Sequence, residues 1–190
     1  RRMKTAGTPT IQAADSVDIE LTTKHNHSHI EQPMALSGIQ RIFAIDQTSD
    51  NTRLVSKVDL IGSHALIYID RGVLTDPTFQ TVQIGSRTHL LEESLAAMNH
   101  SCNPNVYIDT KNMLIKQVKD IRIGDEVTFF YPSTEWSMQN PFECTCGSKQ
   151  CIGWIAGAHK LNGSFGSGNL RFNDHITDRF ESIESIESSM

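Results

Sequence analysis

The sequence predicts a mainly β domain, and two features of the chain from Ile39 onward indicate this class. Short apolar or alternating runs recur there, and Gly, Asp, Asn, Ser and Pro separate them, as is typical of short strands joined by turns. Only one stretch has the composition and spacing of a helix. With 190 residues and 38% hydrophobic content, the chain is expected to form one domain around a single core.

The expected elements follow in order along the chain. Strands are predicted at the apolar runs 42–45, 54–60, 65–69, 79–84, 106–108, 113–118 and 126–131. The turn Ile123-Gly124-Asp125 separates the last two. A helix is predicted over 90–98, because its residues are mostly good helix formers and its apolar residues recur on one face.

Both ends of the chain are expected to be poorly ordered. Residues 1–33 are mostly small, polar or charged, which favours a solvated arm, although 17–21 could pair as an edge strand. Alternating histidines at 25, 27 and 29 are interpreted as part of that arm rather than as a metal site. The Glu-Ser-Ile repeat at 181–187 is expected to fray, together with the chain from about 176. The predicted division is an arm (1–33), a main domain (34–140), a cysteine segment (141–160) and a tail (161–190).

Cys102, Cys144, Cys146 and Cys151 are all the cysteines of the chain, and the last three form Cys-x-Cys-x4-Cys. Four thiolates complete a tetrahedral zinc shell and leave no open position, so such a site is structural. The alternative is two disulfides in a secreted protein. However, the chain does not open with a signal-peptide pattern, and cysteines one residue apart are badly placed to bridge each other. We therefore expect zinc and an intracellular protein, cytoplasmic or nuclear.

Charge and hydropathy argue against two further classes of protein. The formal net charge is −5, whereas a general nucleic-acid binder normally carries a basic stripe, so direct nucleic-acid binding is not expected. The sequence contains no run of about eighteen apolar residues, so a membrane span is not expected either.

Three motifs occur in a fixed order between 99 and 151: Asn-His-Ser-Cys-x-Pro-Asn, then Gly-Asp-Glu-x-Thr-Phe-x-Tyr, then Cys-x-Cys-x4-Cys. Together they closely resemble the SET-domain protein methyltransferases, strongly over roughly 79–157 and more weakly over 35–78. The resemblance implies a SET fold in which the Asn-His-Ser-Cys segment threads beneath the loop of the final strand. Such a pseudoknot is a rare exception to unthreaded chain connections.

The resemblance also implies a cofactor and roles for single residues. Similar proteins bind S-adenosylmethionine on one face and a substrate lysine on the other, joined by a narrow channel. Asn99 and His100 would hold the cofactor, largely through backbone groups. Tyr131 would be the catalytic tyrosine, whose hydroxyl orients the attacking nitrogen. Phe129 matches a phenylalanine-or-tyrosine switch and would permit more than one methyl addition. Read from the residues alone, a strand tyrosine or phenylalanine favours simple packing.

The cysteines fit the same resemblance as a zinc-bound post-SET segment. Cys102 would join Cys144, Cys146 and Cys151 on one metal and tie this segment to the catalytic domain. Trp154 would then cover the adenine or the target side chain, or pack against the cluster.

Two departures from the family pattern keep three functions open. No Gly-x-Gly precedes residue 79, and Phe130 stands where an acidic residue commonly precedes the tyrosine. The chain could be a protein-lysine N-methyltransferase. It could instead be a SET-like enzyme acting on a small molecule in specialised metabolism. The third reading is a non-catalytic SET-like module that binds a partner.

Overall fold

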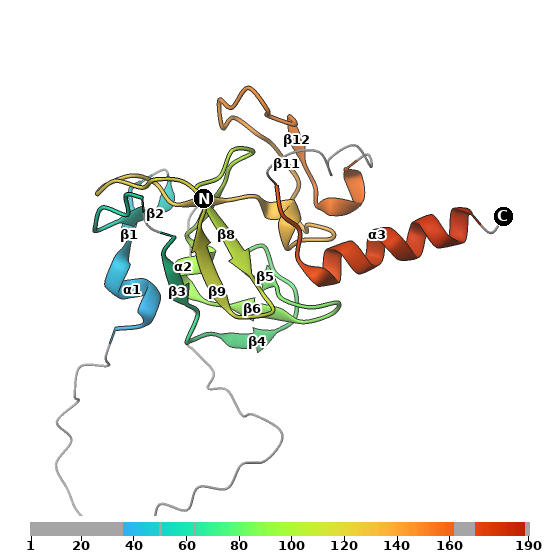
Figure 1. Cartoon of the computed structure of the whole chain (residues 1–190), viewed down its shortest axis with the longest axis horizontal. Coiled ribbons are helices and arrows are strands. Elements are labelled where there is room, and N and C mark those ends of the chain that lie inside the picture. Colours follow the sequence, from blue (N-terminus) through green and yellow to red (C-terminus); the bar gives the residue numbers. More distant parts are fainter. Residues whose placement is uncertain (1–35, 50, 63, 162–169, 189–190) are drawn as a thin grey trace, which may run out of the picture.

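A computed structural model describes residues 36–49, 51–62, 64–161 and 170–188 (Figure 1). The expected arm, the possible strand at 17–21 and the alternating histidines lie outside these ranges. The elements run in the order α1 Gly38–Ile42, β1 Phe43–Gln47, β2 Thr52–Ser56, β3 Leu66–Tyr68, β4 Val73–Thr75, β5 Val82–Gln83, β6 His89–Leu91, α2 Glu93–Ala96, β7 Asn99–His100, β8 Val106–Asp109, β9 Leu114–Gln117, β10 Thr128–Phe129, η1 Tyr131–Ser133, β11 Phe142–Glu143, β12 Trp154–Ile155, η2 Ala158–Lys160 and α3 Asp174–Glu187.

The predicted mainly β class is confirmed, because the described chain forms small sheets with few helices. Its two three-stranded sheets have the orders β3-β9-β8 and β4-β6-β5, all antiparallel. Strands β1 and β2 pair antiparallel, as do β11 and β12, whereas β7 and β10 pair parallel. Each of the seven predicted runs overlaps a strand. None of the described helices is long and apolar enough to cross a bilayer.

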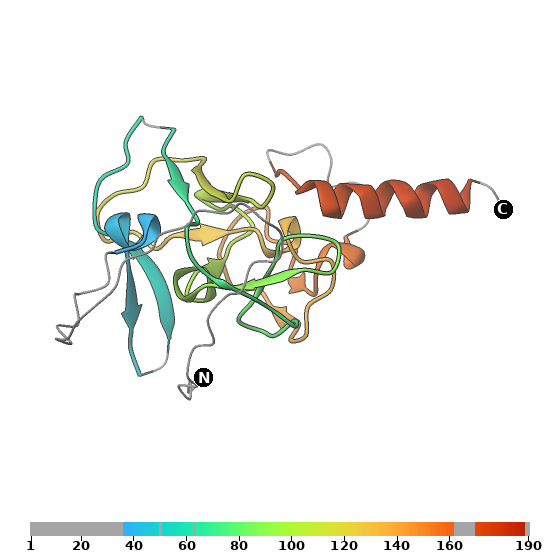
Figure 2. The ribbon, with the colours of Figure 1, turned by 90° about the horizontal axis from the view of Figure 1, so that it is seen from below.

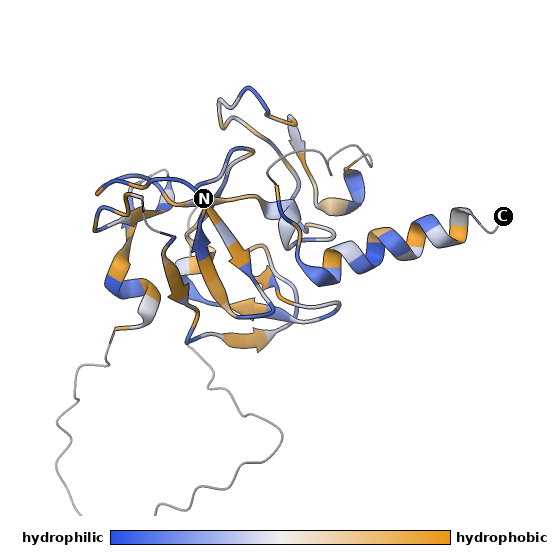
Figure 3. Ribbon diagram, in the orientation of Figure 1, coloured by the Kyte–Doolittle hydropathy of each residue, from blue (hydrophilic) through white to orange (hydrophobic). Residues whose placement is uncertain are grey.

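The core lies between these sheets and draws apolar side chains from most of them, as the orange strands of Figure 3 indicate. Ile108 and Ile115 face each other in the β8–β9 register and are fully buried. Burial of each such side chain contributes roughly 1.5–3 kcal/mol to folding. Val127 continues this core up to β10, so the residues that follow it start from a fixed position.

The predicted helix over 90–98 is wrong in its first half. Leu90 pairs with Leu74 on one side and Val82 on the other, within β6. The helix α2 begins only after Glu92, whose carboxylate accepts a hydrogen bond from the Leu95 backbone N–H at 2.8 Å. Pairing on both edges of β6 therefore overrides the local helix propensity.

The expected fraying of the tail is wrong as well, because 174–187 form helix α3. Ile176 is fully buried, and Asn173 before it is 3% exposed. The Asn173 amide accepts from the Thr110 backbone N–H at 2.9 Å and donates to the carbonyls of Ile108 and Ser133. The first turn is thus anchored, while the outer end projects away from the domain (Figures 1 and 2).

The β7–β10 pairing brings two of the sequence motifs together. Asn99 lies opposite Thr128, and His100 opposite Phe129. Asn105, at the end of the first motif, donates to the Glu126 carbonyl and accepts from the Thr128 backbone N–H, both at 2.8 Å. The first motif is therefore fixed against the final strand, as the expected fold requires. The threading itself stays a prediction.

Candidate active site

A cavity of about 570 Å³ lies where the first two motifs meet. Asn99 and His100 from β7, Phe129 from β10 and Tyr131 from η1 all line it. One wall comes from 77–82 and His89, and a second from 137–140, Phe142 and 144–146, completed by Glu135. Four of the five catalytic and cofactor-binding residues expected from sequence therefore share one cavity.

Tyr131 is held at both ends in this cavity. Its hydroxyl donates to the Met98 carbonyl at 2.9 Å, and its backbone N–H donates to His100 Nδ1 at 3.2 Å. Its ring lies 4.8 Å from that of Phe129 and 5.2 Å from that of His100. Burial, reinforced by the nearby carboxylates of Glu135 and Glu126, raises the pKa of the phenol. The hydroxyl therefore stays protonated and offers a fixed polar group rather than a base.

His100 connects this tyrosine to the cysteines. Because Nδ1 accepts the Tyr131 N–H, the ring proton lies on Nε2, which is 3.2 Å from Cys102 Sγ. Burial lowers the pKa of His100 to about 4, so the ring is neutral at pH 7. A neutral ring that donates from Nε2 suits a thiolate acceptor, as is common for groups next to metal ligands.

Asn99 uses its side chain within the protein. Its Nδ2 donates to Glu126 Oε1 at 2.7 Å and to the Thr52 carbonyl at 3.2 Å. The Asn99 amide nitrogen therefore fixes the Gly-Asp-Glu motif and β2 relative to β7.

Phe129 and Phe130 point to different surroundings. Phe129 is 3% exposed and belongs to the main core, where it also lines the cavity. Phe130, in place of the family's acidic residue, is 2% exposed and packs against the rings of His100 at 5.5 Å and Phe172 at 6.1 Å. Because Phe172 precedes α3, the apolar residue at 130 helps to seat the tail.

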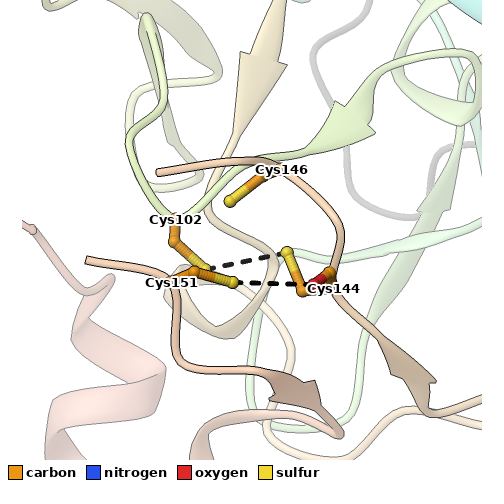
Figure 4. Close-up of side chains that lie close together, drawn as sticks. All are labelled: Cys102, Cys144, Cys146 and Cys151. Carbon is orange, nitrogen blue, oxygen red and sulfur yellow. Dashed lines mark hydrogen bonds between the residues drawn. The ribbon is translucent and has the colours of Figure 1, made fainter. Parts of the chain in front are cut away.

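The four cysteines converge although Cys102 is distant from the others in sequence (Figure 4). Their sulfurs lie within 4.8 Å of one another, and Cys102 Sγ is 3.9 Å from Cys144 Sγ. All four cysteines are free, so the disulfide alternative does not hold in this structure. A tetrahedral zinc with bonds of about 2.3 Å requires sulfurs roughly 3.8 Å apart, so the cluster fits such an ion.

The structure does not bring Trp154 to the cavity. This side chain is 57% exposed on β12 and lies outside both the cavity lining and the apolar cluster around the cysteines. Phe142, one strand away, lies there instead, and its ring is 6.1 Å from that of Tyr131. No pattern in the sequence favours Phe142 over the larger aromatic residue.

Sequence reasoning also missed two polar residues of the cavity, Glu135 and His89. Glu135 is 8% exposed, and burial raises the pKa of its carboxyl to about 7. Burial also lowers the pKa of His89, whose Nδ1 lies 3.2 Å from Thr81 Oγ1. A single glutamate after the tyrosine motif carries no pattern in sequence, and only its burial sets it apart.

The SET domain family model matches residues 6–132, which ends one residue after Tyr131. The chain belongs to the SET domain family. The match includes the Asn-His-Ser-Cys motif and the tyrosine motif and ends before the last three cysteines.

Among curated relatives, Methyltransferase flvH of Aspergillus flavus is 40% identical over 104 residues, which cover 53% of this chain and 58% of that protein. A histone-lysine N-methyltransferase, H3 lysine-36 specific, of Debaryomyces hansenii is 38% identical over 65 residues, 31% of this chain and 9% of that protein. The chain thus spans just over half the length of the first relative and a small part of the second. A solved structure of KRYPTONITE in complex with mCHG DNA and SAH has a TM-score of 0.42 and 18% identity, over 57% of this chain and 27% of that one.

Proposed function

We propose that this SET domain protein is an S-adenosylmethionine-dependent methyltransferase that methylates an amine nitrogen. The observation that carries the proposal is Tyr131, whose hydroxyl is fixed on the Met98 carbonyl within a cavity that Asn99 and His100 also line. A protonated phenol in a largely buried site can orient a nitrogen lone pair and lie beside a partly positive methyl group. Positioning of this kind supplies much of the acceleration in a transfer between two bound reactants.

The residues divide between donor and acceptor in this proposal. Backbone groups of Asn99 and His100 hold the donor, which supplies the methyl group when bound. Phe129 forms the channel wall next to Tyr131, and without a hydroxyl it leaves space for a nitrogen that already carries a methyl group. Trp154, which lies outside the cavity, has no part in this arrangement.

The chain has no Gly-x-Gly before residue 79, so other residues would have to take its part in binding the donor. The chain forms helix α1 over 38–42, and no residue of α1 lines the cavity. Asn51 and Thr52, at the β1–β2 turn, do line it. We propose that the donor is bound by β7 and this turn rather than by a glycine loop. Donor binding of this kind favours a methyltransferase over a non-catalytic module.

We further propose that Cys102, Cys144, Cys146 and Cys151 bind one structural zinc, and that 141–160 form a post-SET segment. Cys144 and Cys146 also line the cavity. A closed four-thiolate site would therefore fix one wall of the cavity and take no part in the chemistry itself. The main domain would then be 34–140, preceded by the arm and followed by the tail.

The acceptor in the first candidate function is a lysine side chain of a protein. It is supported by the relatives named histone-lysine N-methyltransferases, each matched over part of its length. The second candidate is a small-molecule amine, because a cavity of about 570 Å³ falls within the size range of small-molecule pockets.

The proposal is tested by methyl transfer from radiolabelled S-adenosylmethionine to a proteome extract and, separately, to its small-molecule fraction. Wild type should label one of the two fractions. Tyr131→Phe should keep the fold and the affinity for the donor but lower turnover by roughly 10²-fold, because it removes a group that acts in the transition state. Labelling by Tyr131→Phe at the wild-type rate would show that the hydroxyl has no such role.

A further inference from the structure

Glu135 is held in place from three sides. Its Oε1 accepts hydrogen bonds from the Gln83 backbone N–H at 2.7 Å and from Thr134 Oγ1 at 3.2 Å. Its backbone carbonyl accepts from the Ala158 N–H at 2.8 Å. The Gln83 side chain in turn accepts from the Trp136 N–H at 2.9 Å. Contacts to β5, η1 and η2 therefore fix both the backbone and the carboxylate of Glu135.

Close packing on one side strengthens this restraint. Gly157 has a φ of +111°, and a Cβ there would lie 2.5 Å from the Trp136 carbonyl oxygen. The end of the cysteine segment can therefore pass this close to Trp136 and Ser137, next to Glu135, only with glycine at this position. A carboxylate restrained in this way presents its second oxygen in one direction.

The second carboxylate oxygen, Oε2, is left free by these contacts. Both side-chain hydrogen bonds of Glu135 go to Oε1, and within the described ranges none goes to Oε2. Within the described chain, Ser133 Oγ is the one fully buried polar side-chain atom without a hydrogen-bond partner. Oε2, which has no such partner there either, is therefore not fully buried. Since Glu135 lines the cavity, Oε2 is the part of the carboxylate that a ligand can reach.

The negative charge of Glu135 is not needed for the contacts it makes. The two bonds to Oε1 require only an acceptor, which the amide oxygen of a glutamine would also provide. Within the described chain no lysine or arginine forms an ion pair with Glu135; the ion pairs found there involve Asp46, Asp174 and Asp109. A carboxylate that is 8% exposed and has no cation beside it costs folding free energy. Such a group at a cavity wall is a candidate for ligand binding.

Glu135 contacts other parts of the chain than the groups proposed to hold the methyl donor. Its contacts are with β5 and with the residues after Tyr131, whereas Asn99 and His100 contact β2, β10 and Cys102. Tyr131 connects the two groups. It forms hydrogen bonds with Met98 and His100, and the negative charge of Glu135 helps to raise the pKa of its phenol. The carboxylate therefore belongs to the acceptor side.

We propose that Oε2 of Glu135 binds the ammonium group of the methyl acceptor and so selects alkyl amines over neutral alkyl groups of the same size. This inference rests on the proposed methyltransferase function and adds the residue that recognises the acceptor. The shared chemistry is an alkylammonium ion, which either a lysine side chain or a free amine supplies. A charge-assisted hydrogen bond of this kind in a largely buried site provides both affinity and direction.

The test measures binding of n-butylammonium to the full chain by NMR titration, with and without saturating S-adenosylhomocysteine, and compares 1-butanol as a neutral probe of equal length. Nα-acetyl-lysine methylamide serves as a second cation that represents a peptide. Glu135→Gln keeps the acceptor for Gln83, and Glu135→Asp keeps the charge. Glu181→Gln, on the exposed face of α3, is the matched control for loss of one negative charge.

Wild type and Glu181→Gln should bind n-butylammonium at least tenfold more tightly than 1-butanol. Glu135→Gln should lose about tenfold or more of the ammonium affinity, and Glu135→Asp only part of it. Binding of 1-butanol and of S-adenosylhomocysteine should be unchanged in all variants. A free amine as the natural acceptor predicts the tighter binding for n-butylammonium, and a protein lysine predicts it for the lysine derivative.

Equal ammonium affinity in wild type and Glu135→Gln would overturn the proposal. A loss of S-adenosylhomocysteine affinity in Glu135→Gln would also overturn it, because the carboxylate would then belong to the donor site. Chemical shifts in the wild type provide a check that needs no variant. The amides of Gln83 and Trp136 should move when n-butylammonium is added, and perturbation only elsewhere would contradict the proposal. If wild type binds n-butylammonium but not S-adenosylhomocysteine, the methyltransferase function fails and the Glu135 site stands.

Discussion

Single residues of the cavity make the fold's stability depend on pH, and Glu135 does so most directly. Burial raises the pKa of its carboxyl from 4.5 to about 7 in the folded chain. Between these two pH values the folded state holds a proton that the unfolded state has lost. The free energy of unfolding of the wild type therefore falls as pH rises through this window.

Glu135→Gln removes this dependence and should gain stability relative to the wild type by about 2–3 kcal/mol between pH 4 and pH 8. Urea denaturation at a series of pH values measures the difference. His89 and His100, with lowered pKa values, titrate in both proteins and largely cancel in the comparison. His175, near His89, and Tyr131 are also common to both. A constant difference across the series would mean that folding does not raise the pKa of Glu135.

The sequence identified the residues that follow a pattern and missed those that do not. Asn99, His100, Phe129 and Tyr131 lie in motifs of fixed spacing, and all line one cavity. Glu135 depends on burial by η2 and β5, contacts that join distant parts of the chain. Trp154 shows the opposite case, since its size favoured a ligand contact but its position in β12 leaves it exposed.

At the scale of elements, the cysteine segment depends on convergence of four side chains rather than on extensive strand pairing. Its strands β11 and β12 pair over two residues each. We therefore expect about one zinc per chain, and Cys146→Ser should lower both the metal content and the melting temperature, because binding of structural zinc contributes directly to folding. Metal analysis and thermal denaturation measure both quantities. Equal zinc content in wild type and Cys146→Ser would refute the proposed ligand set.

Helix α3 combines an anchored start with an exposed end. Ile176 is fully buried, whereas Ile183 and Ile186 are 42% and 61% exposed. Trp136 also contacts the helix, through the Phe180 ring at 5.3 Å and the Arg179 guanidinium. Because Trp136 follows Glu135, the helix supports the segment that forms the cavity wall.

Truncation distinguishes the two parts of this helix. Ending the chain after Glu181 should change the melting temperature little. Ile176→Ala in the full chain should cost about 2–5 kcal/mol, the range for an isoleucine truncated in a core. Chemical denaturation compares the two variants. An unchanged stability in Ile176→Ala would restore the view of the tail as a frayed segment.

Elements specified by their own residues could be predicted, whereas those set by contacts with distant residues could not. The runs at 106–108 and 113–118 became β8 and β9, because short apolar runs bounded by turn residues specify strands. The stretch 90–98 has helical composition, but β4 and β5 pair with its first half. Helix α3 was missed because its Glu-Ser-Ile repeat is polar and its anchor, Asn173, lies outside the repeat.

For the whole molecule, membership of the SET domain family and the shared cavity support one account. The fold brings the Asn-His-Ser-Cys motif, the final tyrosine and the cysteine cluster together around about 570 Å³ of space. The missing Gly-x-Gly bears on the proposed donor site, whereas the proposed acceptor site uses Glu135, which is held by β5 and by the segment after Tyr131. The proposed function therefore depends first on binding of the methyl donor.

Calorimetric titration of the wild-type chain with S-adenosylmethionine tests this point most directly. The account predicts saturable binding at about one site per chain, with unchanged affinity in Tyr131→Phe. A wild-type chain that is folded and zinc-loaded but gives no binding heat at several temperatures would contradict it, and would instead support a SET domain that binds a partner without catalysis.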